Sequence, residues 1–435
     1  MDVYIVGIRE WHNQTTLHPL GLTATLVLAL LILTLPRRFA VLPMILLGCF
    51  IPVAQRIVIM GNDFTLLRIL VLFAWVRLLA RNEYSEFRWN SLDLMVVSWK
   101  LSGTIIHTLA YGTLSAFINR CGWVFDGIGM YFFFRCVCRS REDIMFLARS
   151  FMLVSVPVAI AFLVERSSGR NMFSVFGGVP EITVVRDGKL RCQGAFSHAI
   201  LAGCYWVLTM PWMIGAMTRG RTLLGIAGLL SGLIVVGSCA SSTPVLALGF
   251  MAIGMTLYFV REQVRAIRWT FFLVLCVLHL IMEKPIWHLI ARVNVVGGST
   301  GFHRYKIMDA TIENFPKWWL LGETNPMSWG VWEMRDVTNQ YILEGLRGGL
   351  VTLLLFIGVI VAAFRLVGRA LATEKDSVVI WSLGATLFVH ASIFFSISYF
   401  GQLMMLWYLT LALIGSLPDI LRLEKTTNSG LENPV

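Results

Sequence analysis

The chain has 435 residues, of which 57% are hydrophobic and 14% are charged, and its formal net charge at pH 7 is +11. An ordinary soluble domain carries about 25% charged residues, so this composition excludes a typical soluble protein and indicates one that crosses a membrane several times. Positive charge is expected in the cytoplasmic loops of such a protein and near anionic lipids, so it gives no reason to expect a nucleic-acid partner.

Long apolar runs mark the predicted spans, because a helix needs about 20 residues to cross a hydrocarbon core of about 30 Å. Twelve or thirteen runs qualify: 18–35, 39–61, 64–80, 94–112, 114–134, 144–165, 199–218, 223–240, 243–260, 270–282, 340–366, 378–401 and 403–421. The run 39–61 contains Gln55 and Arg56 and the run 270–282 is short, so these two are the most open to tilting or breaking. We expect an all-α polytopic membrane protein with a single integral membrane domain over residues 1–435.

Lysine and arginine residues in the short loops predict the orientation. They follow the first span and then every second one: Arg37 and Arg38; Arg77, Arg81 and Arg88; Arg135, Arg139 and Arg141; Arg219 and Arg221; Arg261, Arg265 and Arg268; Arg365, Arg369 and Lys375; Arg422 and Lys425. Such loops stay in the cytoplasm, together with a polar tail, 422–435, that we expect to be disordered. The N-terminus and two long segments, 166–198 and 283–337, then fall on the outer side, where we expect the chemistry.

The outer loop 283–337 contains a segment, 304–317, that a helical wheel divides into two faces. The polar face holds Lys306, Asp309, Glu313 and Lys317, and the apolar face holds Ile307, Met308, Thr311, Ile312 and Phe315. Arg304 lies in the middle of the apolar face, in the first turn, where the helix dipole disfavours a cation. It therefore needs an anionic partner, and phosphate suits a guanidinium beside the N–H groups of a helix start. The alternative is an interfacial helix whose arginine reaches lipid headgroups.

The other outer loop, 166–198, ends in a second arginine. Arg191 precedes a span that opens with small residues and His198. The alternative is again a basic anchor at the membrane surface. Two arginines that precede apolar segments on the same side favour a shared anion site.

Polar residues also mark the point where the large loop enters the next span. Asp336, Thr338 and Asn339 lie just outside this span, and Glu344 and Arg347 follow within its first turns. Glu344 and Arg347 are three residues apart, so they can pair on one helix face. Ionisable residues at this depth usually face a protein-lined cavity, and a purely structural ion pair is the alternative.

The order of these features resembles the O-antigen ligase and Wzy-type polymerase superfamily of bacterial polysaccharide assembly. In that family an arginine precedes a "GxFx(H/N)P"-like span start, a second arginine opens a loop helix followed by "P…LxG", and a "HNxY" motif enters the next span. Here Arg191 is followed by "GAFSHAI", Arg304 by "FPKWWLLGE", and the loop closes on "TNQYILEGLRGG". The similarity covers about residues 190–360 in motif and the whole chain in hydropathy. Thr338 stands in place of the family's histidine, so a histidine-dependent mechanism is not carried over.

The resemblance implies a glycosyltransferase of the bacterial inner membrane whose donor is an oligosaccharide on undecaprenyl diphosphate. The acceptor attacks the anomeric carbon with inversion, lipid diphosphate leaves, and no metal or other cofactor is required. Arg191 and Arg304 are then expected to hold the diphosphate, where prepositioned guanidinium groups stabilise the developing charge. The other candidates for substrate contact are Arg335, Arg347, Asn339 and His198.

The general base is the less specific part of this prediction. Asp336 leads because it stands nearest the family's histidine position, followed by His303, Glu333 and Glu344. The missing histidine favours a polymerase of exopolysaccharide or O-antigen repeats over a ligase that transfers the glycan to a lipid A core. The expected partners are the lipid-linked donor, a glycan acceptor and membrane lipids, and the family would allow a chain-length regulator.

Two alternatives come from other functional classes. A secondary transporter is expected to show two related halves with ionisable residues at mid-membrane, whereas the charges here cluster at the outer rim. A non-catalytic subunit that binds lipid-linked glycan would keep the arginines but need no base.

Overall fold

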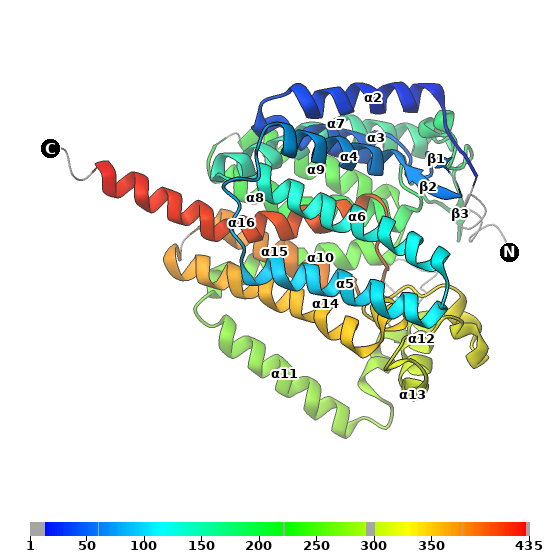
Figure 1. Ribbon diagram of the computed structural model, residues 1–435. Helices are drawn as coiled ribbons and strands as arrows, with labels where there is room; N and C mark the ends of the chain where they lie inside the picture. Colours follow the sequence, from blue (N-terminus) through cyan, green and yellow to red (C-terminus); the bar gives the residue numbers. More distant parts are fainter. Residues whose placement is uncertain (1–13, 60, 221, 293–300, 376, 432–435) are drawn as a thin grey trace.

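The protein is built almost entirely from helices (Figure 1). The computed structural model describes residues 14–59, 61–220, 222–292, 301–375 and 377–431, with side chains to residue 426. About 75% of it is helical, so the predicted all-α class is confirmed. The helices are α2 (Pro19–Thr34), α3 (Leu42–Phe50), α4 (Leu66–Ala80), α5 (Ser91–Tyr111), α6 (Leu114–Val137), α7 (Arg141–Ser168), α8 (Ala199–Met217), α9 (Thr222–Ser238), α10 (Ser242–Thr256), α11 (Val264–Ile281), α12 (Gly301–Glu313), α13 (Phe315–Trp318), α14 (Gln340–Thr373), α15 (Val378–Ile393) and α16 (Gln402–Leu431). Two antiparallel hairpins accompany them, β1 (Arg56–Ile59) with β2 (Asn62–Thr65) and β3 (Val185–Arg186) with β4 (Lys189–Leu190).

Within the described residues, six helices are long and apolar enough to cross a membrane. They are α7, α8, α10 with its 3-10 extension (Ser242–Val260), α11, α14 and α16 to Thr426. The shorter helices α2, α9 and α15 are also apolar. This fits a multi-pass membrane protein with fewer full-length spans than the sequence predicts. α5 and α6 are long, at 21 and 24 residues, but they are not among the six, and Lys100 and Asp126 lie in their middles.

The predicted span 39–61 is wrong as a single helix. α3 ends at Phe50, because Ile51 is extended and Pro52 cannot donate the next helical hydrogen bond. The chain then forms the β1–β2 hairpin, in which Arg56 pairs with Asp63 at 3.1 Å. Of the two polar residues in this run, Gln55 therefore directly precedes the hairpin and Arg56 begins it.

The two ends of the bundle differ in charge. Ion pairs between the short basic loops and neighbouring carboxylates lie at one end, and they join Arg77 to Glu83, Arg139 to Glu86, and Arg141 to Glu374 and Glu424. The described parts of 166–198 and 283–337 lie at the opposite end (Figure 1). The alternation of charges along the sequence thus appears in space as two ends of one bundle.

Burial separates the centre of the bundle from a helix at its margin. α8 and α16 lie at the centre, with most of their residues buried, whereas α11 has none buried. α11 stands apart from the other helices (Figure 1) and exposes large apolar side chains such as Phe271, Phe272 and Leu280. A helix with this surface requires an apolar surrounding, which a lipid bilayer provides. α16 continues through Leu431. The predicted disordered tail, 422–435, is therefore helical as far as residue 431.

The large loop has a small core of its own, seated on the start of α14. The core consists of Ile307, Ala310, Trp318, Met334 and Leu346. Trp318 covers Gly345, where an added Cβ would lie 2.8 Å from the indole ring. Glycine at 345 therefore lets the "FPKWW" segment reach the helix.

α14 is interrupted at Gly348 and Gly349, where the loop inserts. Gly349 has φ +65° and ψ −172°, a conformation essentially restricted to glycine. The groups freed by this break bond to the loop: Leu350 N–H donates to Trp319 O, and Glu323 N–H donates to Leu346 O, each at 2.7 Å. The "WWLLGE" segment of the loop is thus hydrogen-bonded to α14 at the break that the "GLRGG" segment contains.

The predicted amphipathic helix 304–317 is correct only in part. α12 ends at Glu313, and a separate turn, α13, begins at Phe315, one residue before Pro316. Arg304, Ile307 and Thr311 are buried on one face, as predicted. Ile312 and Phe315 are 47% and 41% exposed, so part of the predicted apolar face points away from the protein.

Candidate functional site

Arg304 is almost completely buried, at 5% exposure, on the inner face of α12. Its Nε donates to the carbonyl oxygen of Ser396 at 3.2 Å, and its Nη2 donates to Oγ1 of Thr243 at 2.8 Å. Both acceptors are neutral, and Arg304 forms no ion pair with a carboxylate of the described chain. Burial lowers the pKa of Arg304 to about 10, so it is still a cation at pH 7. An anionic ligand would offset part of its desolvation cost.

The acceptor Thr243 is the last residue of a tight turn, 238–243, that joins α9 to α10. Ala240 has φ +43° there, which is uncommon for a residue with a Cβ. The carbonyl oxygen of Ser238 accepts from the N–H of Cys192 at 3.1 Å, directly after Arg191. The two loops that carry Arg191 and Arg304 therefore meet at this one turn.

Glu165, near the end of α7, holds the loop that carries Arg191. Its carboxylate is buried and accepts three hydrogen bonds, from the Thr183 hydroxyl at 3.1 Å, the Gln193 N–H at 3.1 Å and the Gly194 N–H at 2.9 Å. Arg191 itself is 4% exposed. The sequence reasoning missed Glu165. The available signal was a lone carboxylate in the last turn of an apolar run, because such a group needs several donors to be buried.

His198 is the N-cap of α8. Its Nδ1 accepts from the N–H of Ile200 at 3.2 Å, which leaves Nε2 as the protonated nitrogen of the neutral ring. Burial, followed by the charges of Arg191 and Arg186, lowers the pKa of His198 to about 4. At pH 7 His198 is therefore a neutral helix cap close to Arg191, with a donor at Nε2.

The predicted base candidates around α12 lie together. Nε2 of His303 is 3.2 Å from the backbone carbonyl oxygen of Asp336, whose residue is exposed. Glu333 lies in the turn just before Asp336 and pairs with Lys306 at 3.3 Å. Since His303 directly precedes Arg304, α12 carries both the buried cation Arg304 and a neighbour of Asp336.

The segment that leads into α14 contains three predicted or polar residues, Arg335, Thr338 and Asn339. Asn339 caps the helix, accepting from the Ile342 N–H at 3.1 Å, and its Nδ2 lies 3.4 Å from the carbonyl oxygen of Phe395. The Arg335 guanidinium lies 5.2 Å from the Trp332 ring centre. The Thr338 hydroxyl oxygen is buried and has no hydrogen-bond partner in the described part of the chain, so it can bond to a ligand or to water.

The predicted pair between Glu344 and Arg347 is wrong. Glu344 instead accepts from Trp99 Nε1 at 2.8 Å and from Gln340 Nε2 at 2.7 Å, so both of its oxygens are engaged. Arg347 lies over the Trp123 ring, 5.1 Å from its centre. Gln340 lies one turn before Glu344 on α14 itself, whereas Trp99 and Trp123 lie on α5 and α6, which helix spacing alone does not reveal. These contacts disfavour Glu344 as a base and separate Arg347 from the elements that hold Arg304.

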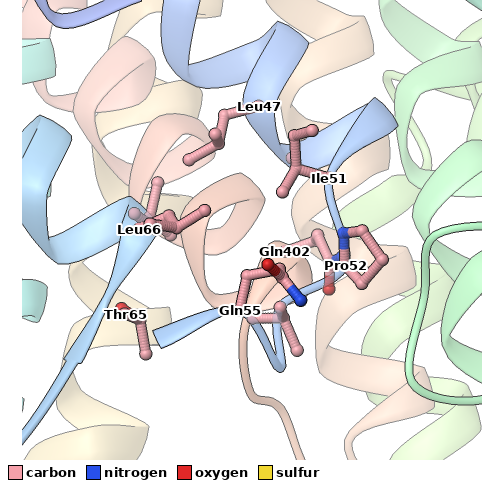
Figure 2. Close-up of a pocket in the computed structure, with 10 residues that line it drawn as sticks. Leu47, Ile51, Pro52, Gln55, Thr65, Leu66 and Gln402 are labelled. Carbon is pink, nitrogen blue, oxygen red and sulfur yellow. The ribbon is translucent and has the colours of Figure 1, made fainter. Parts of the chain in front are cut away.

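A small pocket lies between α3, α4 and the start of α16 (Figure 2). Its lining is mainly apolar, and its polar side chains are Gln55, Thr65 and Gln402. None of the predicted site residues lines it, and none of its lining residues is charged. It is unsuited to a diphosphate, so we place the candidate site at the turn 238–243.

Comparison with known proteins adds no assignment. No protein-family model matches the chain, and no curated protein matches it. In the described residues, no group of three or more His, Cys, Asp or Glu side chains is arranged to hold a metal ion. The functional interpretation therefore depends on the arginines and their surroundings.

Proposed function

We propose that the protein is a membrane glycosyltransferase whose donor is a glycan linked to a polyprenyl diphosphate such as undecaprenyl diphosphate. The observation that carries this proposal is the buried Arg304, which two neutral oxygens hold and no carboxylate of the described chain neutralises. A diphosphate supplies both the negative charge and the several acceptor oxygens that a guanidinium fork prefers. Arg191 supports the same assignment, because its loop and the Thr243 partner of Arg304 meet at one turn.

In the proposed reaction, an acceptor hydroxyl oxygen bonds to the anomeric carbon of the donor glycan. The bond from that carbon to the diphosphate oxygen breaks, and its electron pair leaves with the lipid diphosphate. The hydroxyl proton passes to a base or to the departing diphosphate. The arginines act on the step in which charge builds on the leaving group, where fixed donors in a poorly hydrated site are most effective.

Asp336 remains the first candidate for the base. Its exposed position at the rim of α12 suits an acceptor that arrives from outside the bundle. His303 is the second candidate, because it neighbours both Asp336 in space and Arg304 in sequence. The buried Thr338 hydroxyl can bond to substrate but is no base at neutral pH, which favours a polymerase over a histidine-dependent ligase.

A reconstitution experiment tests the proposal. Purified protein in sealed proteoliposomes would receive a polyprenyl-diphosphate oligosaccharide, and glycan length and free lipid diphosphate would be measured. Longer glycan with released lipid diphosphate is the expected result. Binding without turnover would instead indicate a non-catalytic subunit, and movement of the glycan into sealed vesicles would indicate a transporter.

Substitutions connect this test to the site. Arg304→Ala and Arg191→Ala should each reduce turnover by about a hundredfold, the usual order for losing one donor of a preorganised anion site. Arg170→Ala is the matched control, because Arg170 is 70% exposed and pairs with an exposed Glu181 in the same outer loop. Full activity in both Arg304→Ala and Arg191→Ala would contradict the assignment.

A further inference from the structure

Three cations meet where α5 packs against α6 and α14. Lys100 lies on α5, Arg120 on α6 and Arg347 on α14, and the three charges act on one another. In the described part of the chain, none of the three forms an ion pair with a carboxylate. We call these three side chains the cation cluster. Like charges repel, and Glu344 alone does not balance three cations, so a further anion would lower the free energy of the arrangement.

Aromatic rings and His107 hold the cation cluster in place, and Nη2 of Arg120 lies 3.0 Å from Nδ1 of His107. Lys100 Nζ lies 3.8 Å from the ring centre of its neighbour Trp99. Arg347 and Arg120 lie 5.1 and 6.0 Å from the ring centre of Trp123, on α6. Cation–π contacts orient a cation but leave its N–H groups available to an anion.

Carboxylates near the cation cluster are engaged elsewhere. Glu344 accepts from Trp99 and Gln340, as described above. Asp126 is bound by both ends of the Arg68 guanidinium, at 2.8 and 2.7 Å. The charge of Glu344 acts on all three cations, and that of Asp126 acts on Lys100 but is paired with Arg68. One carboxylate without an ion pair, Glu344, therefore faces three cations.

Unsatisfied polar atoms accompany the excess of charge. Arg120 Nε and the Tyr408 hydroxyl are buried and have no hydrogen-bond partner among the described residues. Gly127, on α6, faces Tyr408 and Lys100: an added Cβ would lie 2.5 Å from the Tyr408 hydroxyl and 3.0 Å from Lys100 Cε. Buried donors without acceptors are rare in native proteins, and an anion with several oxygens would satisfy them.

We propose that the cation cluster binds the phosphate headgroup of a membrane lipid. The cluster differs from the site of Arg304, whose contacts lie on the turn 238–243 and on Ser396. Phosphate fits because it offers more than one negative charge and oxygens for both guanidinium forks and the ammonium group.

A lipid suits this position better than a free ion. The outer halves of α5 and α6 expose apolar side chains beside the cluster, among them Ile105, Leu109 and Phe117 at 58%, 65% and 44%. An acyl or isoprenyl chain can lie along these side chains while its headgroup reaches inward. These apolar side chains lie on the same two helices as Lys100 and Arg120.

Thermal unfolding of the full-length protein in detergent, followed by tryptophan fluorescence, tests this proposal. The probes are dioleoyl phosphatidic acid, dioleoyl phosphatidylcholine and inorganic pyrophosphate. Phosphatidic acid should raise the Tm by several degrees, and phosphatidylcholine, whose phosphate charge is balanced by choline, should raise it much less. An increase in Tm with pyrophosphate, and none with phosphatidic acid, would overturn the assignment to a lipid.

Variants locate the site. Lys100→Gln and Arg347→Gln should each weaken the apparent affinity for phosphatidic acid about tenfold without lowering the Tm of the lipid-free protein, because each relieves repulsion. Arg304→Gln should keep the shift, which separates this proposal from the proposed function. A lower lipid-free Tm with an unchanged lipid shift in both cluster variants would show a purely structural role and overturn the proposal.

A labelling experiment covers the case in which the cluster variants do not purify. Wild-type protein would be irradiated with a diazirine-tagged phosphatidic acid, and the labelled peptides would be identified by mass spectrometry. Labels on α5 and α6 beside the cluster support the site. Labels confined to other helices would refute it.

Discussion

The buried cations at the two ends of this bundle have different partners. At the basic end, Arg77, Arg135 and Arg141 are each bonded to carboxylates, which are Glu83, Asp93 with Asp419, and Glu374 with Glu424. Arg304 at the opposite end, and the cation cluster between that end and the middle of α5, have neutral oxygens, aromatic rings or His107 as their contacts in the described chain. The opposite end also contains paired arginines, Arg56 and Arg68, so the difference belongs to particular sites.

Under the two proposals above, this difference separates charges that hold the fold together from charges that bind an anion. A buried arginine that is paired on all sides holds helices together, and its removal leaves a carboxylate without a partner. A buried arginine without a carboxylate costs stability in the free protein, and that cost is recovered when an anion binds. Substitution should therefore lower stability at the first kind of site and lower binding or turnover at the second.

The largest expected effect is on stability at the basic end. Arg135→Ala would leave Asp93, which is fully buried, without its cation. We expect a loss of about 3–5 kcal/mol in the free energy of unfolding, the usual range for breaking a buried pair. Denaturant unfolding in detergent measures it. Arg170→Ala, in an exposed pair, should change the value by less than about 1 kcal/mol.

Arg304→Gln should lower turnover without lowering stability. The glutamine keeps a donor near Thr243 but removes the charge, so we expect about a hundredfold loss of turnover, or roughly 3 kcal/mol in the barrier. The Tm of the ligand-free protein should not fall, because a desolvated cation is removed. A decrease in stability as large as that of Arg135→Ala would contradict the comparison of the two ends.

Gly349→Ala should have an intermediate effect that involves no charge. An added Cβ would lie 2.4 Å from the carbonyl oxygen of Leu320, and the backbone conformation at 349 disfavours any other residue. We expect a loss of about 1–3 kcal/mol in stability, together with weaker protection of 319–323 in hydrogen exchange. Gly237→Ala is the matched control, because nothing lies within 4 Å of its added Cβ.

The smallest effect concerns pH. The pKa of His198 is about 4 in the folded protein and about 6.5 when unfolded. The unfolded state therefore binds more protons between these values, and the contribution of neutral His198 to stability is complete above about pH 6.5 and lost as the pH falls toward 4. His198→Ser keeps an N-cap that does not titrate. Its Tm should fall less steeply than that of the wild type over this pH range, and an equal slope would exclude His198 as the cause.

The sequence by itself predicted the helical class and the separation of basic loops from long loops. It also placed Arg304 on the apolar face of a loop helix, because these features follow from local periodicity and composition. Hydropathy placed most helices but failed at 39–61, where α3 ends before Pro52 and the β1–β2 hairpin begins at Arg56, and it overestimated the number of full-length spans. The predicted pair of Glu344 with Arg347 failed because residues from α5 and α6 compete for both side chains.

Tertiary structure alone decided which charges are paired. Nothing local to Arg304 shows that its acceptors are Thr243 and Ser396, and nothing local to Lys100 shows that it faces Arg120 and Arg347. The periodicity of a helix indicates which of its residues are buried, because burial follows the faces of that helix. Whether it is neutralised depends on residues far away in the chain, because electrostatic interactions act through space and the fold determines which groups come together.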